Sequence, residues 1–359
     1  MMKKMRGIKF NLPQRARFHF ADSKGNLKRI FSSDQLFAAI INNAALLYNG
    51  NEVNEIVDHF VNNKFIISSL YYGLDIYSNS EEELVETIYF LPKPFWLIRS
   101  DNISTDDFKK RKKFKKVSFI SVDVYQKLLD SWDKEEEYFN FDLLNLPTIG
   151  DRFAVTKEEL AGLRFSDKDR SDIKFISSNT YQKLQVNRLN NGSENTYYQN
   201  ELEISHLNIG EYLIKPFMFF MYRGDLSQKL YASLRLLVEE GLGGKRSRGL
   251  GYLNSIEKIE LPLSDKGTGD RFISMSTVYP NRDELDYSMS YQLRRKDGYI
   301  YDFGGTPFRR KTIRLMSEGS MFSRDIKGQV VDVTPEDNSF KCSHDILVNG
   351  KAFLLGFGG

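Results

Sequence analysis

A glycine-rich basic loop between a helix and a strand is the feature that most constrains the fold of this chain. Residues 241–251 read Gly-Leu-Gly-Gly-Lys-Arg-Ser-Arg-Gly-Leu-Gly. Residues 226–240 before it carry leucines at helical spacing, and residues 252–261 after it are typical of a strand. A dinucleotide-binding loop needs the reverse order, and a Walker A loop needs Ser or Thr where this chain has Arg246. The sequence therefore excludes both of these nucleotide sites.

The charge of this loop points to a different anionic ligand. A loop that follows a helix lies at the negative end of the helix dipole, which repels phosphate. Attraction must then come from Lys245, Arg246 and Arg248, together with backbone groups that the glycines expose. We expect these residues to contact the backbone of a nucleic acid, although a flexible surface turn would have the same composition.

Composition narrows the remaining function classes. The chain has 359 residues, a net charge of +3, four histidines and a single cysteine, Cys342. One cysteine allows no internal disulfide, which suits a reducing cytoplasm, and the histidines lack the spacing of metal ligands on one helix. No signal peptide or membrane-spanning run is present. We therefore expect a cytoplasmic protein without metal or other cofactor.

The order of elements favours an α+β fold. A loose strand over residues 7–20 precedes a helix that begins at Ser32, where Gln35 completes a capping box, and ends near Asn49. A second helix spans about 53–61, and strands are expected over 66–72, 87–91 and 211–222. Arms on both sides of Asn191-Gly192 predict a β-hairpin that projects from the body. The expected parts are an N-terminal domain (1–145), an irregular insertion (146–210) and a C-terminal domain (211–359).

Two further basic segments leave their roles open. Residues 291–314 carry seven cations against two acids and interleave them with aromatic residues, as proteins that bind single-stranded RNA do. Core rings alternating with surface charges on strands would look the same. Residues 109–116 hold seven basic residues in eight, typical either of a solvated face or of contact with a phosphate backbone. His19 fits a half-buried strand residue, an RNA contact or a general acid–base.

Several stretches resemble one family. The loop at 241–252 resembles the glycine-rich loop of the RAMP superfamily of CRISPR RNA-binding proteins. Other stretches, in the family's order, resemble subunit four of the type III-A Csm complex: Phe18-His-Phe, Ser32-Ser-Asp-Gln-Leu-Phe, Val186-Asn-Arg-Leu-Asn-Asn-Gly, Gly298-Tyr-Ile, Arg309-Arg-Lys, Glu318-Gly-Ser-Met-Phe, Gly328-Gln-Val-Val-Asp-Val-Thr-Pro and Gly350-Lys-Ala-Phe. Asn187 departs from the family, which often has Asp there.

This resemblance implies a fold and a role. It implies two ferredoxin-like domains and a hairpin thumb, here about residues 185–203, that displaces a guide–target base pair. It also implies a non-catalytic subunit that caps the 5′ handle of the CRISPR RNA and docks a large polymerase-like subunit and a backbone RAMP subunit. The expected RNA-binding residues are Lys245, Arg246, Ser247, Arg248, Gly243, Gly244, Gly249, His19, Ser32, Ser33, Asp34, Arg188, Arg294, Arg309 and Arg310.

Two alternatives accompany this interpretation. The first is a metal-independent RAMP endoribonuclease that processes CRISPR repeat RNA, with His19 as its acid–base. The second is the equivalent subunit of a type III-B complex. Among the residues at the start of the first helix, Ser32 has a competing role as the helix cap.

Overall fold

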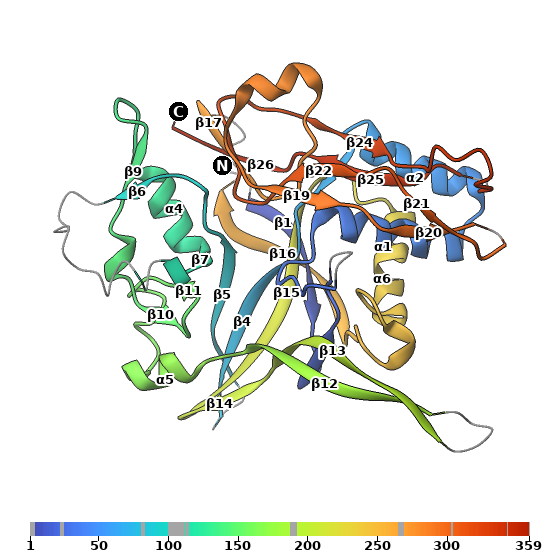
Figure 1. Cartoon of the computed structure of the whole chain (residues 1–359). Coiled ribbons are helices and arrows are strands. Elements are labelled where there is room, and N and C mark those ends of the chain that lie inside the picture. Colours follow the sequence, from blue (N-terminus) through green and yellow to red (C-terminus); the bar gives the residue numbers. More distant parts are fainter. Residues whose placement is uncertain are drawn as a thin grey trace.

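One mostly antiparallel sheet, assembled from both halves of the chain, forms the centre of the molecule (Figure 1). Four neighbouring strands of this sheet lie in the order β4-β15-β1-β16 and pair antiparallel. Together with two helices they give the β-α-β-β-α-β sequence of a ferredoxin-like unit, and the expected α+β class is confirmed. The elements of this unit are β1 (Lys4–Asn11), α1 (Ser33–Leu47), β4 (Tyr71–Ser78), β15 (Tyr212–Gly224), α6 (Gln228–Glu240) and β16 (Ser255–Ser264).

The structure is a computed structural model. It describes residues 4–21, 25–79, 83–99, 112, 115–186, 192–264, 269–302, 304–342 and 344–358. No helix in this part of the chain is long and apolar enough to cross a bilayer.

The helices begin where the sequence places their caps. The backbone N–H of Ser32 donates to Oε1 of Gln35 at 3.3 Å, as a capping box requires. Ser227 caps α6, because its hydroxyl accepts from the backbone N–H of Leu230 at 3.3 Å. α1 and α6 pack together beside the sheet (Figure 1). A further helix, α2 (Gly50–Val61), lies against α1.

The C-terminal domain predicted to begin at residue 211 shares a sheet with the start of the chain. The elements after that residue, β15 to β16, complete the sheet that starts with β1. Phe10 of β1 lies opposite Met218 of β15 on one side and opposite Ile256 of β16 on the other. Strand periodicity indicates which residues extend but not which strand they pair with, so sequence order suggested a division that the hydrogen-bonded sheet does not have.

The segments between β1 and β15 add strands at the margins of this sheet and the projecting hairpin. α4 packs against β5 and β16. The bounds are β2 (Arg15–Phe18), β3 (Phe65–Ile67), β5 (Leu84–Pro92), β6 (Ile98–Arg99), β7 (Phe119–Ser121), α4 (Val122–Asp130), β8 (Trp132–Asp133), β9 (Tyr138–Asn140), η1 (Leu143–Asn145), β10 (Thr148–Ile149), β11 (Phe153–Ala154), α5 (Asp167–Asp172), β12 (Ile176–Val186), β13 (Ser193–Ser205) and β14 (Leu207–Ile209).

After β16 the described chain forms small antiparallel sheets that lie across the top of the ferredoxin-like unit (Figure 1). The larger of them has the order β18-β23-β17-β26. The bounds here, with the short helix of the glycine loop, are η2 (Arg246–Arg248), β17 (Arg271–Ser274), η3 (Arg282–Tyr287), β18 (Ser288–Ser290), β19 (Leu293–Lys296), β20 (Tyr299–Tyr301), β21 (Pro307–Arg309), β22 (Ile313–Met316), β23 (Met321–Phe322), β24 (Gly328–Asp332), β25 (Leu347–Lys351) and β26 (Leu354–Phe357).

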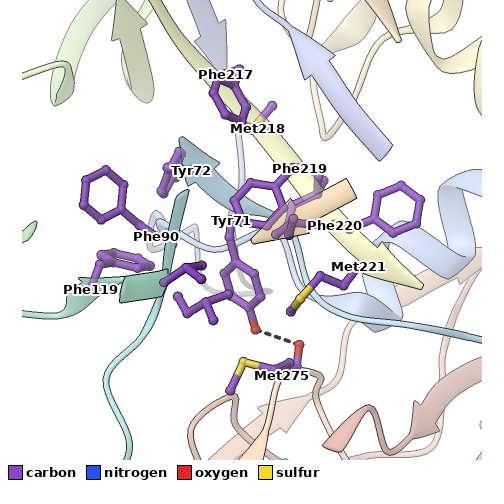
Figure 2. Close-up of a cluster of buried hydrophobic side chains, with 14 of the residues drawn as sticks. Tyr71, Tyr72, Phe90, Phe119, Phe217, Met218, Phe219, Phe220, Met221 and Met275 are labelled. Carbon is purple, nitrogen blue, oxygen red and sulfur yellow. Dashed lines mark hydrogen bonds between the residues drawn. The ribbon is translucent and has the colours of Figure 1, made fainter. Parts of the chain in front are cut away.

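The aromatic core continues from the central sheet into this C-terminal part. Tyr71 of β4 is fully buried, and its ring lies beside Phe219 of β15 (Figure 2). Its hydroxyl donates to the backbone carbonyl of Met275, which follows β17, at 2.6 Å. Burial raises the pKa of Tyr71 well above its usual range. A buried phenol needs such a partner, so this hydrogen bond joins the two parts of the chain.

Candidate nucleic-acid interface

The glycine loop folds back on β2. The backbone N–H of Gly251 donates to the carbonyl of Arg17 at 2.8 Å, and the N–H of Gly244 donates to the carbonyl of His19 at 3.1 Å. A Cβ on Gly243, whose φ is +91°, would lie 2.9 Å from the ring of Phe20. The glycines therefore allow the loop to approach β2 and its following residues more closely than side chains would permit.

This geometry corrects the expected role of two glycines. The sequence predicts that their backbone groups add hydrogen bonds to RNA. The N–H of Gly244 is instead committed to His19, and the N–H of Gly249 donates to the carbonyl of Arg246 at 2.9 Å. Neither donor is free, because the loop uses both to hold its own shape.

The projecting hairpin is longer than the sequence predicts. Its first strand, β12, begins at Ile176 rather than near residue 185, and it pairs with β13 throughout its length (Figure 1). The base of β13 pairs in turn with β2, with Leu202 opposite Phe18. The predicted contact Arg188 lies outside the described residues. Apolar or aromatic side chains are exposed along the arms, at Leu184, Val186, Tyr197 and Tyr198.

The loop and the hairpin meet at Arg248. Its guanidinium donates to the hydroxyl of Tyr197 on β13 and lies 5.6 Å from the centre of that ring. It also contacts Oε1 of Gln199 at 3.4 Å. Nδ1 of His19 is 2.9 Å from the carbonyl oxygen of Asn200, so a proton on Nδ1 makes this a hydrogen bond. Segments that are far apart in sequence thus form one surface.

One buried and one half-buried carboxylate hold cations along the base of the hairpin. Glu201 is fully buried, with Arg17 at 3.6 Å and Lys183 at 3.3 Å. Glu203 pairs with Arg15 at 2.7 Å. Burial alone would raise the pKa of Glu203, but hydrogen bonds from Arg15 and Tyr181 outweigh it and lower that pKa. These carboxylates fix the positions of three cations that the sequence analysis missed.

Exposed cations also lie on the loop itself. Residues 244–249 are exposed, including Ser247. Arg246 pairs with Glu240 at the end of α6, at 3.4 Å. Lys245 has a left-handed backbone with φ of +62°, an unusual conformation for a residue with a side chain. Within the described ranges, Lys245 has no ion-pair partner. Its charge is available to a ligand.

The start of α1 does not join this surface. Ser32, Ser33 and Asp34 are buried, at 1%, 0% and 3% exposure. The backbone N–H of Ser33 donates to the Ser69 hydroxyl at 2.9 Å, and the backbone N–H of Thr277 donates to the Ser33 hydroxyl at 3.0 Å. The contact of these three residues with RNA bases stays a prediction; in this structure Ser33 and Asp34 instead bind the C-terminal part of the chain.

Two expected RNA contacts on β19 and after β21 join the same internal network. Arg294 donates to Oε2 of Glu318 at 3.0 Å, and Lys296 forms an ion pair with Asp34. Burial alone would raise the pKa of Asp34, but the charge of Lys296 outweighs it and lowers that pKa. Arg310 donates to the carbonyl of Asp297 at 2.5 Å, and burial lowers its pKa. The alternation of Arg294 and Lys296 on one strand face was the signal that could have located this network.

Arg309 is exposed, but on a separate hairpin. It lies on β21, directly opposite Tyr299 of β20. Tyr299 and Tyr301 are 68% and 69% exposed. A cation beside exposed rings is a combination that can contact phosphates and stack on bases. In Figure 1 this hairpin of β20 and β21 lies above the projecting hairpin of β12 and β13.

Within the described residues, no group of three or more His, Cys, Asp or Glu side chains is arranged to hold a metal ion. Of the basic run at 109–116, only residues 112, 115 and 116 are described. Lys116 pairs with Asp151 at 3.4 Å.

Comparisons with known proteins agree with this fold. A model of the CRISPR Csm4 C-terminal domain matches residues 267–357. A Csm4 protein of Methanocaldococcus jannaschii is 26% identical over 380 aligned positions, which cover 95% of each chain. One from Streptococcus thermophilus is 35% identical over 121 positions, covering 32% of this chain and 40% of that protein.

Solved structures show the same architecture. A chain of the crystal structure of a Csm3–Csm4 subcomplex from a type III-A CRISPR-Cas interference complex superposes with a TM-score of 0.65 at 22% identity, covering 99% of this chain and all of that one. A chain of a Csm1–Csm4 cassette in complex with pppApA gives 0.56 at 16% identity, covering 99% and 98%. These solved chains share the fold of this chain over 99% of its length. Over most of its length the chain is similar to Csm4 proteins.

Proposed function

We propose that this chain is a non-catalytic, RNA-binding subunit of a cytoplasmic type III-A CRISPR interference complex, and that it caps the 5′ handle of the CRISPR RNA. The observation that carries the proposal is the contact of Arg248 with Tyr197, which joins the glycine loop to the projecting hairpin. Arg248 of the loop and the cations Arg17 and Lys183 at the base of the hairpin thereby gather on one surface around β13. A single-stranded RNA backbone is the ligand that such a surface suits.

The loop would bind phosphates chiefly through side chains. Lys245, Arg246 and Arg248 carry the exposed charge, and the Ser247 hydroxyl can add a hydrogen bond. The half-buried His19 ring lies beside Gly244 and would border the same RNA path. Its Nδ1 is engaged by Asn200, which supports a bracing role for this histidine rather than an acid–base role.

The hairpin would act as a thumb between guide and target RNA. Leu184 and Val186 on β12 are 57% and 58% exposed, and Tyr198 on β13 is 71% exposed. Exposed apolar side chains on a projecting element can insert between bases and unstack them. Displacement of a guide–target base pair is the proposed outcome.

The proposed partners come from the solved structures that this chain resembles. The solved relatives were crystallised as Csm3–Csm4 and Csm1–Csm4 assemblies. We infer that this chain likewise docks a backbone RAMP subunit and a large polymerase-like subunit. The CRISPR RNA and the target RNA would be its nucleic-acid ligands.

A filter-binding titration of the purified chain tests the proposal. The ligands are a guide RNA with its 5′ handle and the same RNA with the handle scrambled. Tighter binding to the intact handle without cleavage would support a capping subunit, and equal binding would contradict handle recognition by this chain. Specific cleavage of repeat RNA that is lost in His19→Ala would contradict the non-catalytic role. Lys168→Ala is the control for His19→Ala, because Lys168 is an exposed residue on α5 in the insertion.

A further inference from the structure

A groove on the C-terminal part of the chain collects arginines on the face of β19 that points away from the internal network. It has a volume of about 820 Å³ and lies between η3 and the β19–β22 pair. Arg282, Arg295 and Arg314 line it, and within the described residues no carboxylate does. Because side chains alternate along a strand, Arg294 and Lys296 serve the network while Arg295 faces the groove.

Two of these arginines are placed against each other. Arg295 on β19 lies directly opposite Arg314 on β22. Like charges at opposed positions destabilise an antiparallel pair. Nε of Arg295 is 2.8 Å from a carboxylate oxygen of Asp297, which offsets part of the repulsion. Within the described ranges, Arg282 and Arg314 have no ion-pair partner. The groove therefore has a net positive charge that an anionic partner would neutralise.

The apolar side chains that line the groove distinguish between a protein partner and an RNA partner. Leu285 and Leu293 line the groove and are 50% and 54% exposed, and Ile313 and Met316 add further apolar surface. Exposed aliphatic side chains gain free energy when they are buried against other apolar side chains. RNA bases instead stack on flat rings or guanidinium planes. Aliphatic side chains flanked by arginines are typical of an interface with a protein.

The position of the groove supports a separate role. η3 and β19 lie at the top of the molecule in Figure 1, whereas β12 and β13 lie at its base. We propose that this groove, defined by Arg282, Leu285, Leu293, Arg295 and Arg314, docks an acidic protein segment that carries aliphatic side chains. Its glutamates or aspartates pair with the arginines, and its aliphatic side chains cover the two leucines.

Fluorescence anisotropy with a labelled peptide of alternating glutamate and leucine tests this proposal on the purified full chain. Binding should weaken about tenfold or more in Arg314→Glu, and it should weaken with added salt. A control peptide in which glutamine replaces each glutamate should bind the unaltered chain no more tightly than the original peptide binds Arg314→Glu. Arg309→Glu is the matched control, because Arg309 is an exposed strand arginine outside the groove.

Loss of folding should not explain weaker binding by Arg314→Glu. Arg314→Glu would place a carboxylate opposite Arg295 and replace a repulsive pair with an attractive one, so the melting temperature should stay equal or rise. Leu293→Ser, a change at a half-exposed position, tests the apolar contribution separately. Absence of peptide binding to the unaltered chain, or equal binding by Arg314→Glu, would overturn the proposal. Displacement of the peptide by a uridine oligonucleotide from this groove would assign it to RNA instead and would also overturn it.

Discussion

Asp34 at the start of α1 and Lys296 on β19 form a buried ion pair across 262 positions of sequence (296 − 34). Asp34 is 1% exposed at its side chain and Lys296 is 20% exposed. The pair belongs to the network that also joins Ser33 to Thr277 and Arg294 to Glu318. It holds the C-terminal sheets against the ferredoxin-like unit, and it keeps the start of this helix buried.

Breaking this pair should destabilise the fold. Removal of the lysine leaves the buried Asp34 carboxylate without its ion-pair partner, so Lys296→Met should lower the free energy of unfolding by about 3–5 kcal/mol. Urea denaturation followed by tryptophan fluorescence measures the change. The double variant Asp34→Ala with Lys296→Met removes both charges and should recover part of the loss. If the free energy of unfolding falls by less than it does for a surface substitution, the ion pair contributes little to stability.

Stability should depend on pH through Lys93. Burial lowers the pKa of Lys93 from 10.5 to about 8 in the folded chain. Between these two values the unfolded chain binds a proton that the folded chain has released, so stability rises with pH across this window. Below about pH 8 both states are protonated and this dependence disappears.

Urea denaturation of the unaltered chain and of Lys93→Met at several pH values measures this effect. The difference between the two proteins separates the contribution of Lys93 to the pH dependence from that of the buried tyrosines. The stability of the unaltered chain relative to the variant should increase from about pH 8 to about pH 10. An identical pH profile for both proteins would contradict the lowered pKa of Lys93.

RNA binding should lose salt dependence when loop cations are removed. Lys245→Ala together with Arg248→Ala should weaken binding to RNAs of any sequence, and it should flatten the plot of log K against log salt by about one unit per lost contact. Lys245→Gly is a useful companion, because it removes the charge and also the left-handed strain at φ +62°. An unchanged salt slope in both variants would contradict the phosphate contacts.

Two glycines of the loop provide a test of close packing. Gly243→Ala should destabilise the protein by about 1–3 kcal/mol beyond backbone strain, because its Cβ would lie 2.9 Å from Phe20. Gly249 has a similar positive φ of +77° with no atom within 4 Å of its Cβ position, so Gly249→Ala carries the strain alone. Thermal unfolding compares the two. Equal losses would mean that contact with Phe20 does not matter.

The Tyr198 side chain on the proposed thumb should contact RNA without contributing to the stability of the fold. Tyr198 is 71% exposed, so Tyr198→Ser should leave the melting temperature nearly unchanged. In the assembled complex it should reduce displacement of a guide–target base pair, measured by a fluorescent base analogue at that position. The substitution Tyr252→Ser, at an exposed tyrosine after the glycine loop, is the control. Undiminished displacement in Tyr198→Ser would contradict the wedge role of this side chain.

Local signals in the sequence determined most elements of the central unit. The capping residues and leucine spacing predicted α1 and α6 because these preferences act within a few residues of the chain. The apolar run at 211–222 predicted β15, which the structure places at Tyr212–Gly224. The Asn191-Gly192 turn signal predicted a hairpin but not the nine residues by which β12 starts before residue 185 (185 − 176).

Tertiary structure alone decided which of these elements meet. β1 pairs with β16 because their registers and buried faces match, and no local pattern encodes that partner. The same holds for the charges. Sequence composition identified Arg248, Arg294 and Arg310 equally as cations, but burial and distance assign the first to the exposed loop and the others to internal contacts. A charge acquires its role from the dielectric and the partners around it, and only the folded chain sets both.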